Sequence, residues 1–69
     1  MNMIPVSSSN LVAVGYDKAS MTLRIKFNSG TYDYHNVPES IYNGLLSASS
    51  KGQYHHAFIK TSYGFTKIA

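Results

Sequence analysis

The chain has 69 residues, no cysteine and a formal net charge of +3. This length fits one domain, and a domain so small buries only about 60% of the surface that its unfolded chain exposes. The absence of cysteine excludes disulfides and zinc–thiolate sites, and it fits a reducing compartment. We therefore expect oligomerisation, a possible homo-oligomer, as the additional source of stability.

The sequence contains no membrane or export signal. No apolar segment is long enough to cross a bilayer. Residues 1–9 lack the basic start and the apolar centre of a signal peptide. We expect a cytoplasmic protein with no membrane partner.

The charges are distributed unevenly along the chain. In residues 1–39 the numbers of basic and acidic residues are equal. Residues 40–69 contain Lys51, Lys60 and Lys67 and no acid. This asymmetry favours a polyanionic partner. A small positive net charge can also be explained by solubility alone, so a polyanionic partner and simple solubility are both open interpretations.

The first part of the chain predicts the start of an antiparallel sheet. Residues 1–10 form a polar N-terminal arm. Leu11–Tyr16 is a short apolar run with branched side chains, typical of a strand, and Asp17–Ser20 is the turn after it. In Met21–Phe27 apolar and polar side chains alternate, which predicts a strand with one buried face and one wet, basic face.

A third strand, Thr31–His35, follows a tight turn at Asn28–Gly30, in which Gly30 can adopt a positive φ. The length of this turn decides on which face Tyr32 and Tyr34 lie.

With a two-residue loop of Ser29 and Gly30, Tyr32 pairs with Phe27, Tyr34 pairs with Ile25, and both tyrosines belong to the apolar face. With a three-residue loop, the same tyrosines lie opposite the basic side chains of the preceding strand. We expect the first register, because it keeps the apolar side chains on one face.

The first predicted helix starts at Val37-Pro38-Glu39, where proline suits the first turn and the acid suits the positive end of the helix dipole. Ile41, Leu45 and Ala48 share one apolar stripe, and the helix should end near Ala48. Gly44 weakens this helix and can mark a close packing contact.

The second predicted helix starts at Ser50, and Gln53 completes a capping-box pattern. Its expected inward stripe is Tyr54, Ala57, Phe58 and Thr61, with His55 and His56 on polar stripes. Residues 63–68 form either a short extra strand or an ordered tail.

The sequence thus predicts a single α+β domain over residues 1–69, with an arm at 1–10 and a tail at 63–69. A three-stranded antiparallel meander packs on two helices in the order β-β-β-α-α, with the short C-terminal strand as an option.

Motifs along the chain resemble the KTSC domain family. The matching segments are Gly15-Tyr16-Asp17, Leu23, Phe27, Gly30, Tyr32-Asp33-Tyr34, Val37-Pro38, Ser50-Lys51-Gly52-Gln53-Tyr54, Ile59-Lys60 and Tyr63. That family is named after a domain at the C-terminus of some lysyl-tRNA synthetases, and it also occurs as small free-standing proteins in bacteria and phages. The resemblance runs from Pro5 to Ile68 and implies no settled activity, although RNA binding is the usual suggestion.

A phosphate-bearing ligand would be held by basic and helix-start residues. The candidates are Arg24, Lys26, Ser50, Lys51, Gly52, Lys60 and Lys67. Tyr34, Tyr54 and Tyr63 are candidates for stacking on bases. The plainer interpretation is a solvated strand face for the first two candidates and ordinary helix capping by Ser50.

Metal and catalytic sites are not expected. His55 and His56 diverge by about 100° on a helix, and His35 with Asp33 lacks a visible third ligand. No catalytic constellation stands out, so we expect no enzyme and no cofactor. A nuclease with His55 or His56 as general base is the enzymatic alternative.

The expected function is therefore non-catalytic binding of RNA or another nucleic acid. One alternative is a small oligomeric protein that binds or sequesters a nucleotide, including a cyclic one, at subunit interfaces. Another is a protein-interaction domain that pairs through its sheet edge or its tail.

Overall fold

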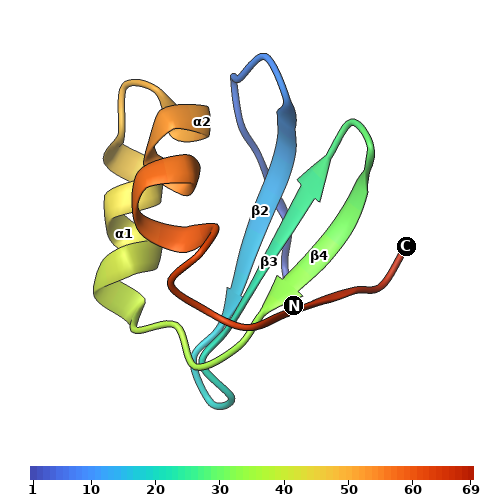
Figure 1. Cartoon of the computed structure of the whole chain (residues 1–69), viewed down its shortest axis with the longest axis vertical. Helices are drawn as coiled ribbons and strands as arrows, with labels where there is room; N and C mark the ends of the chain where they lie inside the picture. The colour runs from blue at the N-terminus through green and yellow to red at the C-terminus, as the bar shows by residue number, and fades with distance from the viewer.

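A computed structural model describes residues 1–69 and shows an α+β fold, in which two helices cover one face of an antiparallel sheet (Figure 1). The sheet has five strands in the order β1-β2-β3-β4-β5. Their bounds are β1 Ile4–Pro5, β2 Leu11–Asp17, β3 Thr22–Phe27, β4 Gly30–Tyr34 and β5 Phe65–Lys67.

The sequence predicted a three-stranded meander, and the sheet has two strands more than that. The three predicted strands are present as β2, β3 and β4, and the optional C-terminal strand is confirmed as β5. The arm adds β1, in which Ile4 pairs with Val14. The element order is β-β-β-β-α-α-β. With two and three residues, β1 and β5 are too short to show a periodic pattern in the sequence. They are stabilised by hydrogen bonds to backbone groups of the neighbouring strands β2 and β4.

The β3–β4 hairpin turns through Asn28 and Ser29, so that Phe27 lies opposite Gly30. Tyr32 pairs with Ile25 instead of Phe27. The expected pairing is thus wrong by two residues, whereas the expected face is right, because a shift of two keeps every side chain on its own face.

Gly30 has φ +153°, and a Cβ atom there would lie 2.8 Å from the backbone oxygen of Ala69. The residue is therefore needed both for the turn and for the close approach of the C-terminal segment.

The first helix, α1, spans Glu39–Ser47 with Ala48 as its C-cap, which confirms the predicted helix. Leu45 is its fully buried residue and packs with Val14, Leu23 and Ile25 of the sheet in one core cluster. No helix of the chain is both long enough and apolar enough to cross a membrane.

Gly44 of α1 faces the ring of Tyr54 in the second helix. A Cβ atom at this position would collide with the Tyr54 hydroxyl. The expectation that Gly44 marks a close packing contact is confirmed.

The second helix begins as α2, Lys51–Tyr54, and continues without a break into a π-helix, η1, His55–Ile59. The Ser50 hydroxyl accepts a hydrogen bond from the backbone N–H of Gln53 at 3.3 Å, as the capping pattern predicted.

The expected inward stripe of this helix is largely wrong. His55 and Ile59 point into the core, whereas Ala57, Phe58 and Thr61 are exposed. The predicted stripe is out of phase by one residue, since the buried His55 and Ile59 directly follow the predicted Tyr54 and Phe58.

Candidate ligand-binding groove

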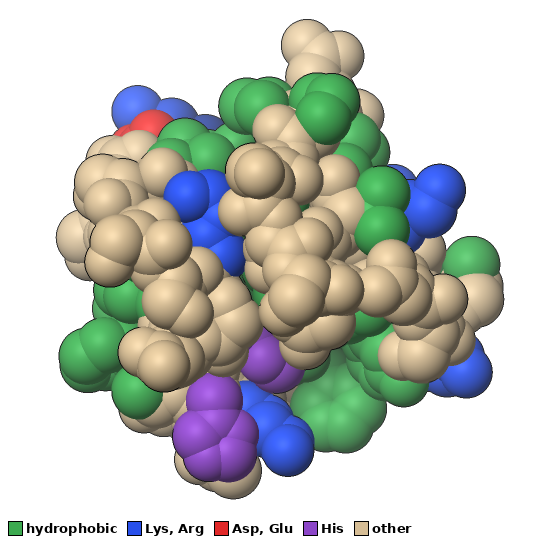
Figure 2. Space-filling view, turned by 90° about the horizontal axis from the view of Figure 1, so that it is seen from above, with side chains coloured by type: hydrophobic (Ala, Val, Ile, Leu, Met, Phe, Trp, Pro, Cys, Tyr) green, Lys and Arg blue, Asp and Glu red, His purple; other side chains and the backbone are tan.

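Two hollows meet where the second helix faces the β3–β4 hairpin, and together they form what we call the groove. The polar hollow has a volume of about 580 Å³. The aromatic hollow has a volume of about 540 Å³. Phe27, His55 and Lys60 line both. Figure 2 shows this end of the molecule, where histidine and lysine side chains gather beside hydrophobic ones.

The aromatic hollow is walled by rings from neighbouring strands. Tyr32 contacts Phe27 and Phe65 edge-on, with ring centroids 5.7 Å apart in each pair. Phe65 lies opposite Tyr34 in the β4–β5 ladder, and their centroids are also 5.7 Å apart. Directly opposed residues of antiparallel strands share a face, so β5 adds its ring to the side covered by the helices.

His55 forms the floor between the two hollows and is 9% exposed. Its Nε2 lies 2.8 Å from the hydroxyl oxygen of Tyr34, and its ring meets Phe27 edge-on at 4.9 Å. Burial, with Lys60 and His56 as further causes, lowers the pKa of His55 below its ordinary value of 6.5. At neutral pH the imidazole is therefore uncharged.

The groove carries positive charge and no acid. Lys60 lies at the junction and His56 lines the polar hollow. Lys67 stands at the rim, with Nζ 5.9 Å from the ring centroid of Tyr32. The chain's three acids are Asp17, Asp33 and Glu39, and none of them lines either hollow.

The structure brings some predicted site residues together. Ser50, Gly52 and Lys60 line the polar hollow, Tyr34 lines the aromatic hollow, and Lys67 stands at its rim. These five residues come from three segments of the chain, namely the second helix with its caps, β4 and β5.

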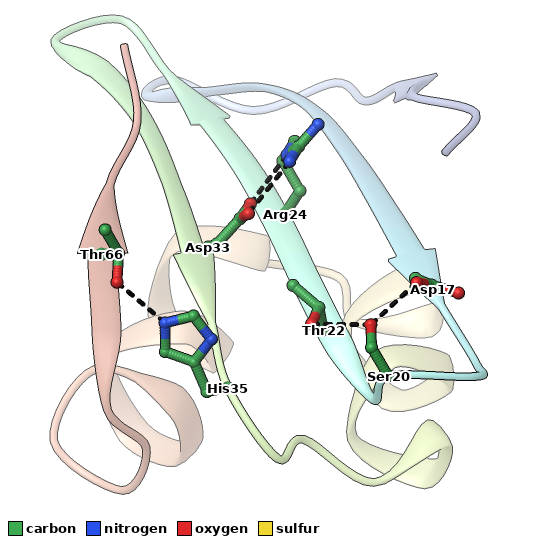
Figure 3. Close-up of polar contacts among 7 residues, drawn as sticks. All are labelled: Asp17, Ser20, Thr22, Arg24, Asp33, His35 and Thr66. Atoms are coloured by element: carbon green, nitrogen blue, oxygen red, sulfur yellow. Dashed lines mark hydrogen bonds and ion pairs between the residues drawn. The ribbon is translucent and has the colours of Figure 1, made fainter.

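Other predicted site residues lie elsewhere. Arg24 and Lys26 belong to the sheet face that the helices leave open, and Arg24 is paired with Asp33 there (Figure 3). The Lys51 ammonium donates a hydrogen bond to the backbone oxygen of Ala48 at 3.0 Å and does not line the groove.

Two of the three predicted stacking tyrosines are also outside the groove. Tyr54 packs against Phe58, with ring centroids 4.8 Å apart, and borders a separate hollow of about 340 Å³. Tyr63 is half-buried against the core.

The predicted ligand site left out several residues that line the groove, among them its aromatic side chains Phe27, Tyr32 and Phe65 and the imidazole of His55. The alternating pattern of the strands contains the signal for Phe27 and Tyr32, since it places both on the apolar face. His55 was expected on a polar stripe, whereas the structure places it inward against Tyr34 and Phe27, which are contacts that no local pattern indicates.

The fold and this groove define a class of small α+β domain with a short antiparallel sheet, two covering helices and a basic, aromatic cleft. The chain belongs to the KTSC domain family, whose family model, described as "KTSC domain", matches residues 7–63. The resemblance stated from the sequence is thereby confirmed.

Similar proteins span most of this chain. A protein of Tsukamurella paurometabola is 39% identical over 62 residues, which cover 88% of this chain and 92% of that protein. The crystal structure of a KTSC domain protein from Yersinia pestis has a TM-score of 0.96 and 39% identity, covering 99% of this chain and 97% of the other.

A lysine–tRNA ligase of Nostoc sp. PCC 7120 is 34% identical over 68 residues. That match covers 97% of this chain and 12% of the ligase. The chain therefore corresponds to a small part of the ligase.

Proposed function

We propose that this domain is a non-catalytic binding module and that its ligand is single-stranded RNA held in the groove. One observation carries the proposal. A continuous cleft without acids combines exposed ammonium groups with aromatic walls, and Lys60 lies where the two hollows join.

Single-stranded RNA needs both features. Its phosphates require positive charge, and its unpaired bases stack on aromatic side chains at about 1–3 kcal/mol per base. Lys60, Lys67 and the ring of His56 supply the polar contacts, while Phe27 and Phe65 offer apolar surface. The match to a part of a lysine–tRNA ligase supports a role near RNA.

The non-catalytic part of the proposal rests on the surroundings of the histidines. No carboxylate lines the groove, so neither His55 nor His56 has an acidic partner there to orient it as a general base. In addition, Nε2 of His55 is already hydrogen-bonded to the hydroxyl of Tyr34.

A free nucleotide is the second candidate, and the size of the aromatic hollow favours it. Its volume of about 540 Å³ is within the range of small-molecule sites. The hollow is open, so a second copy of the chain would be needed to close it over such a ligand.

Fluorescence anisotropy with a labelled oligouridine at increasing salt tests the proposal. We expect Lys60→Ala to weaken binding and to reduce the slope of log K against log salt by about 0.7. Lys18→Ala is the matched control, because it removes the same charge from a side chain that is 82% exposed and borders neither hollow.

Two results would contradict the proposal. The first is that the unmodified protein does not bind oligouridine at low salt. The second is that Lys18→Ala weakens binding as much as Lys60→Ala, which would indicate a diffuse charge effect and no defined groove.

A further inference from the structure

The imidazole of His55 uses one ring nitrogen within the protein and leaves the other free. Nε2 is hydrogen-bonded to the Tyr34 hydroxyl, whereas Nδ1 has no partner in the chain. No side-chain nitrogen or oxygen that is sealed from solvent lacks a partner. Nδ1 is therefore not sealed from solvent, and His55 lines both hollows of the groove.

The position of the ring proton follows from Tyr34. This side chain is 4% exposed, and His55 is the sole hydrogen-bond partner of its hydroxyl. The hydroxyl proton has no other acceptor within the chain, so we assign the Tyr34 hydroxyl as the donor to Nε2. A neutral imidazole that accepts at Nε2 carries its proton on Nδ1. The floor of the groove thus presents an N–H donor.

The surroundings of this donor indicate what it binds. On one side lie Lys60, His56 and Gln53, all of which can donate to an anion. On the other side lie the rings of Tyr32 and Phe65. A ligand that spans the junction needs an anionic group next to a flat ring, and a nucleotide has both.

Building on the proposed function, we propose that the junction binds one nucleotide unit, with a phosphate oxygen on His55 Nδ1–H and on the Lys60 ammonium. The base of that nucleotide lies in the aromatic hollow against Tyr32 and Phe65. His55 is a ligand-contacting residue in this arrangement, and Tyr34 is a positioning residue that holds the ring in one tautomer.

Calorimetric titrations with uridine monophosphate, uridine and inorganic phosphate test which part of the nucleotide is bound. We expect uridine monophosphate to bind at least tenfold more tightly than uridine, and phosphate to compete with it. Equal affinity for uridine and its monophosphate would overturn the proposal. A uridine dinucleotide contains one internal phosphodiester and no terminal phosphate. It should bind more tightly than uridine if the junction recognises the phosphate of an RNA chain, and no more tightly than uridine if the junction recognises only a free terminal phosphate.

Three variants test the role of the donor. His55→Phe keeps a ring but removes the donor, and the affinity for uridine monophosphate should fall about tenfold. His55→Asn places an amide N–H near the position of Nδ1 and should restore part of the affinity. Unchanged affinity in His55→Phe, or no recovery in His55→Asn relative to it, contradicts the assignment.

Tyr34→Phe tests the positioning role, because it removes the hydroxyl that bonds His55 and keeps the ring that lines the aromatic hollow. We expect it to keep the fold and to weaken uridine monophosphate severalfold. The ¹⁵N chemical shifts of His55 should change from one protonated and one unprotonated nitrogen to an average of both tautomers. Unaltered ¹⁵N shifts would refute the positioning role.

Failure of this inference differs from failure of the proposed function. Oligouridine binding that depends on Lys60 but is insensitive to every His55 variant overturns the nucleotide site and leaves RNA binding intact. A protein that binds neither oligouridine nor uridine monophosphate overturns both.

Discussion

Arg24 and Asp33 form a two-point ion pair across β3 and β4 on the open face of the sheet (Figure 3). The Arg24 Nε donates to Asp33 Oδ1 at 2.7 Å, and Nη2 donates to Oδ2 at 2.9 Å. This hydrogen bonding holds the pKa of Asp33 below its ordinary value. Two donors of Arg24 are thus occupied within the protein, on the side of the sheet opposite the groove.

Arg24→Ala should therefore affect stability more than ligand binding. We expect a loss of about 1 kcal/mol in the free energy of unfolding, because Asp33 loses a charged partner at a site that is partly exposed. Urea denaturation measures this loss. Lys26→Ala, an exposed change on the same face, is the control and should be close to neutral.

The effect of Arg24→Ala should also depend on pH. The pKa of Asp33 is lower in the folded protein than its ordinary 3.8, so the pair stabilises the fold above about that pH and loses its effect as pH falls through the folded value. Denaturation at low pH should bring the variant and the unmodified protein together. A constant difference at all pH values would contradict this.

The burial of His55 predicts a second pH dependence of stability. Here too the protein becomes less stable as pH falls, but the change occurs at higher pH than that of Asp33. Its pKa is lowered in the folded protein, so the unfolded chain binds more protons below the ordinary value of 6.5. Stability should therefore fall as pH decreases below about 6.5. No acid faces the imidazole to offset this; its neighbours are Lys60, His56, Phe27 and Tyr34.

Urea midpoints measured at several pH values test this effect. His55→Gln should flatten the pH profile in this range, while His56→Gln, a change at an exposed neighbour, should retain it. An equal slope in His55→Gln and the unmodified protein would show that another group is responsible.

Gly44→Ala should destabilise the protein although alanine favours a helix by about 1 kcal/mol. The added methyl group meets the Tyr54 ring, which must move out of its packed position. We expect a net loss of about 1–3 kcal/mol in urea denaturation. Gly64→Ala is the control, because a Cβ atom there has no neighbour within 4 Å. Similar effects of both substitutions would disprove the contact.

Phe65→Ala should separate binding from stability. Phe65 is 56% exposed, so its removal costs little folding free energy. It contacts Tyr32 and Tyr34 in the wall of the aromatic hollow, so oligouridine affinity should fall by about 1 kcal/mol or more. Anisotropy and urea denaturation on the same sample measure both quantities. Full binding by the variant would place the bases elsewhere.

Much of the fold could be predicted because its signals are local. The alternation in Met21–Phe27 indicates a strand that is buried on one face, and Leu23 and Ile25 are fully buried. The start of α1 after Pro38 and the hydroxyl cap of Ser50 depend on neighbours within four residues. Such features need no knowledge of the rest of the chain.

The candidate site could be predicted only in part. Lys60 and Ser50 were identified from charge and helix position, and the structure places both in the groove. Arg24 fits a phosphate ligand equally well in sequence, but its pairing with Asp33 nine residues away on the next strand is a tertiary contact.

By itself the sequence determined the class of fold, the family, the acid-free final part of the chain and the face on which Tyr32 and Tyr34 lie. Those properties follow from composition and from periods of a few residues. Only the tertiary structure decided that β1 and β5 complete the sheet and that His55 lies inward with its ring on the Tyr34 hydroxyl. The physical reason is that short edge strands and the inward position of His55 depend on partners far away in the sequence, which local patterns do not encode.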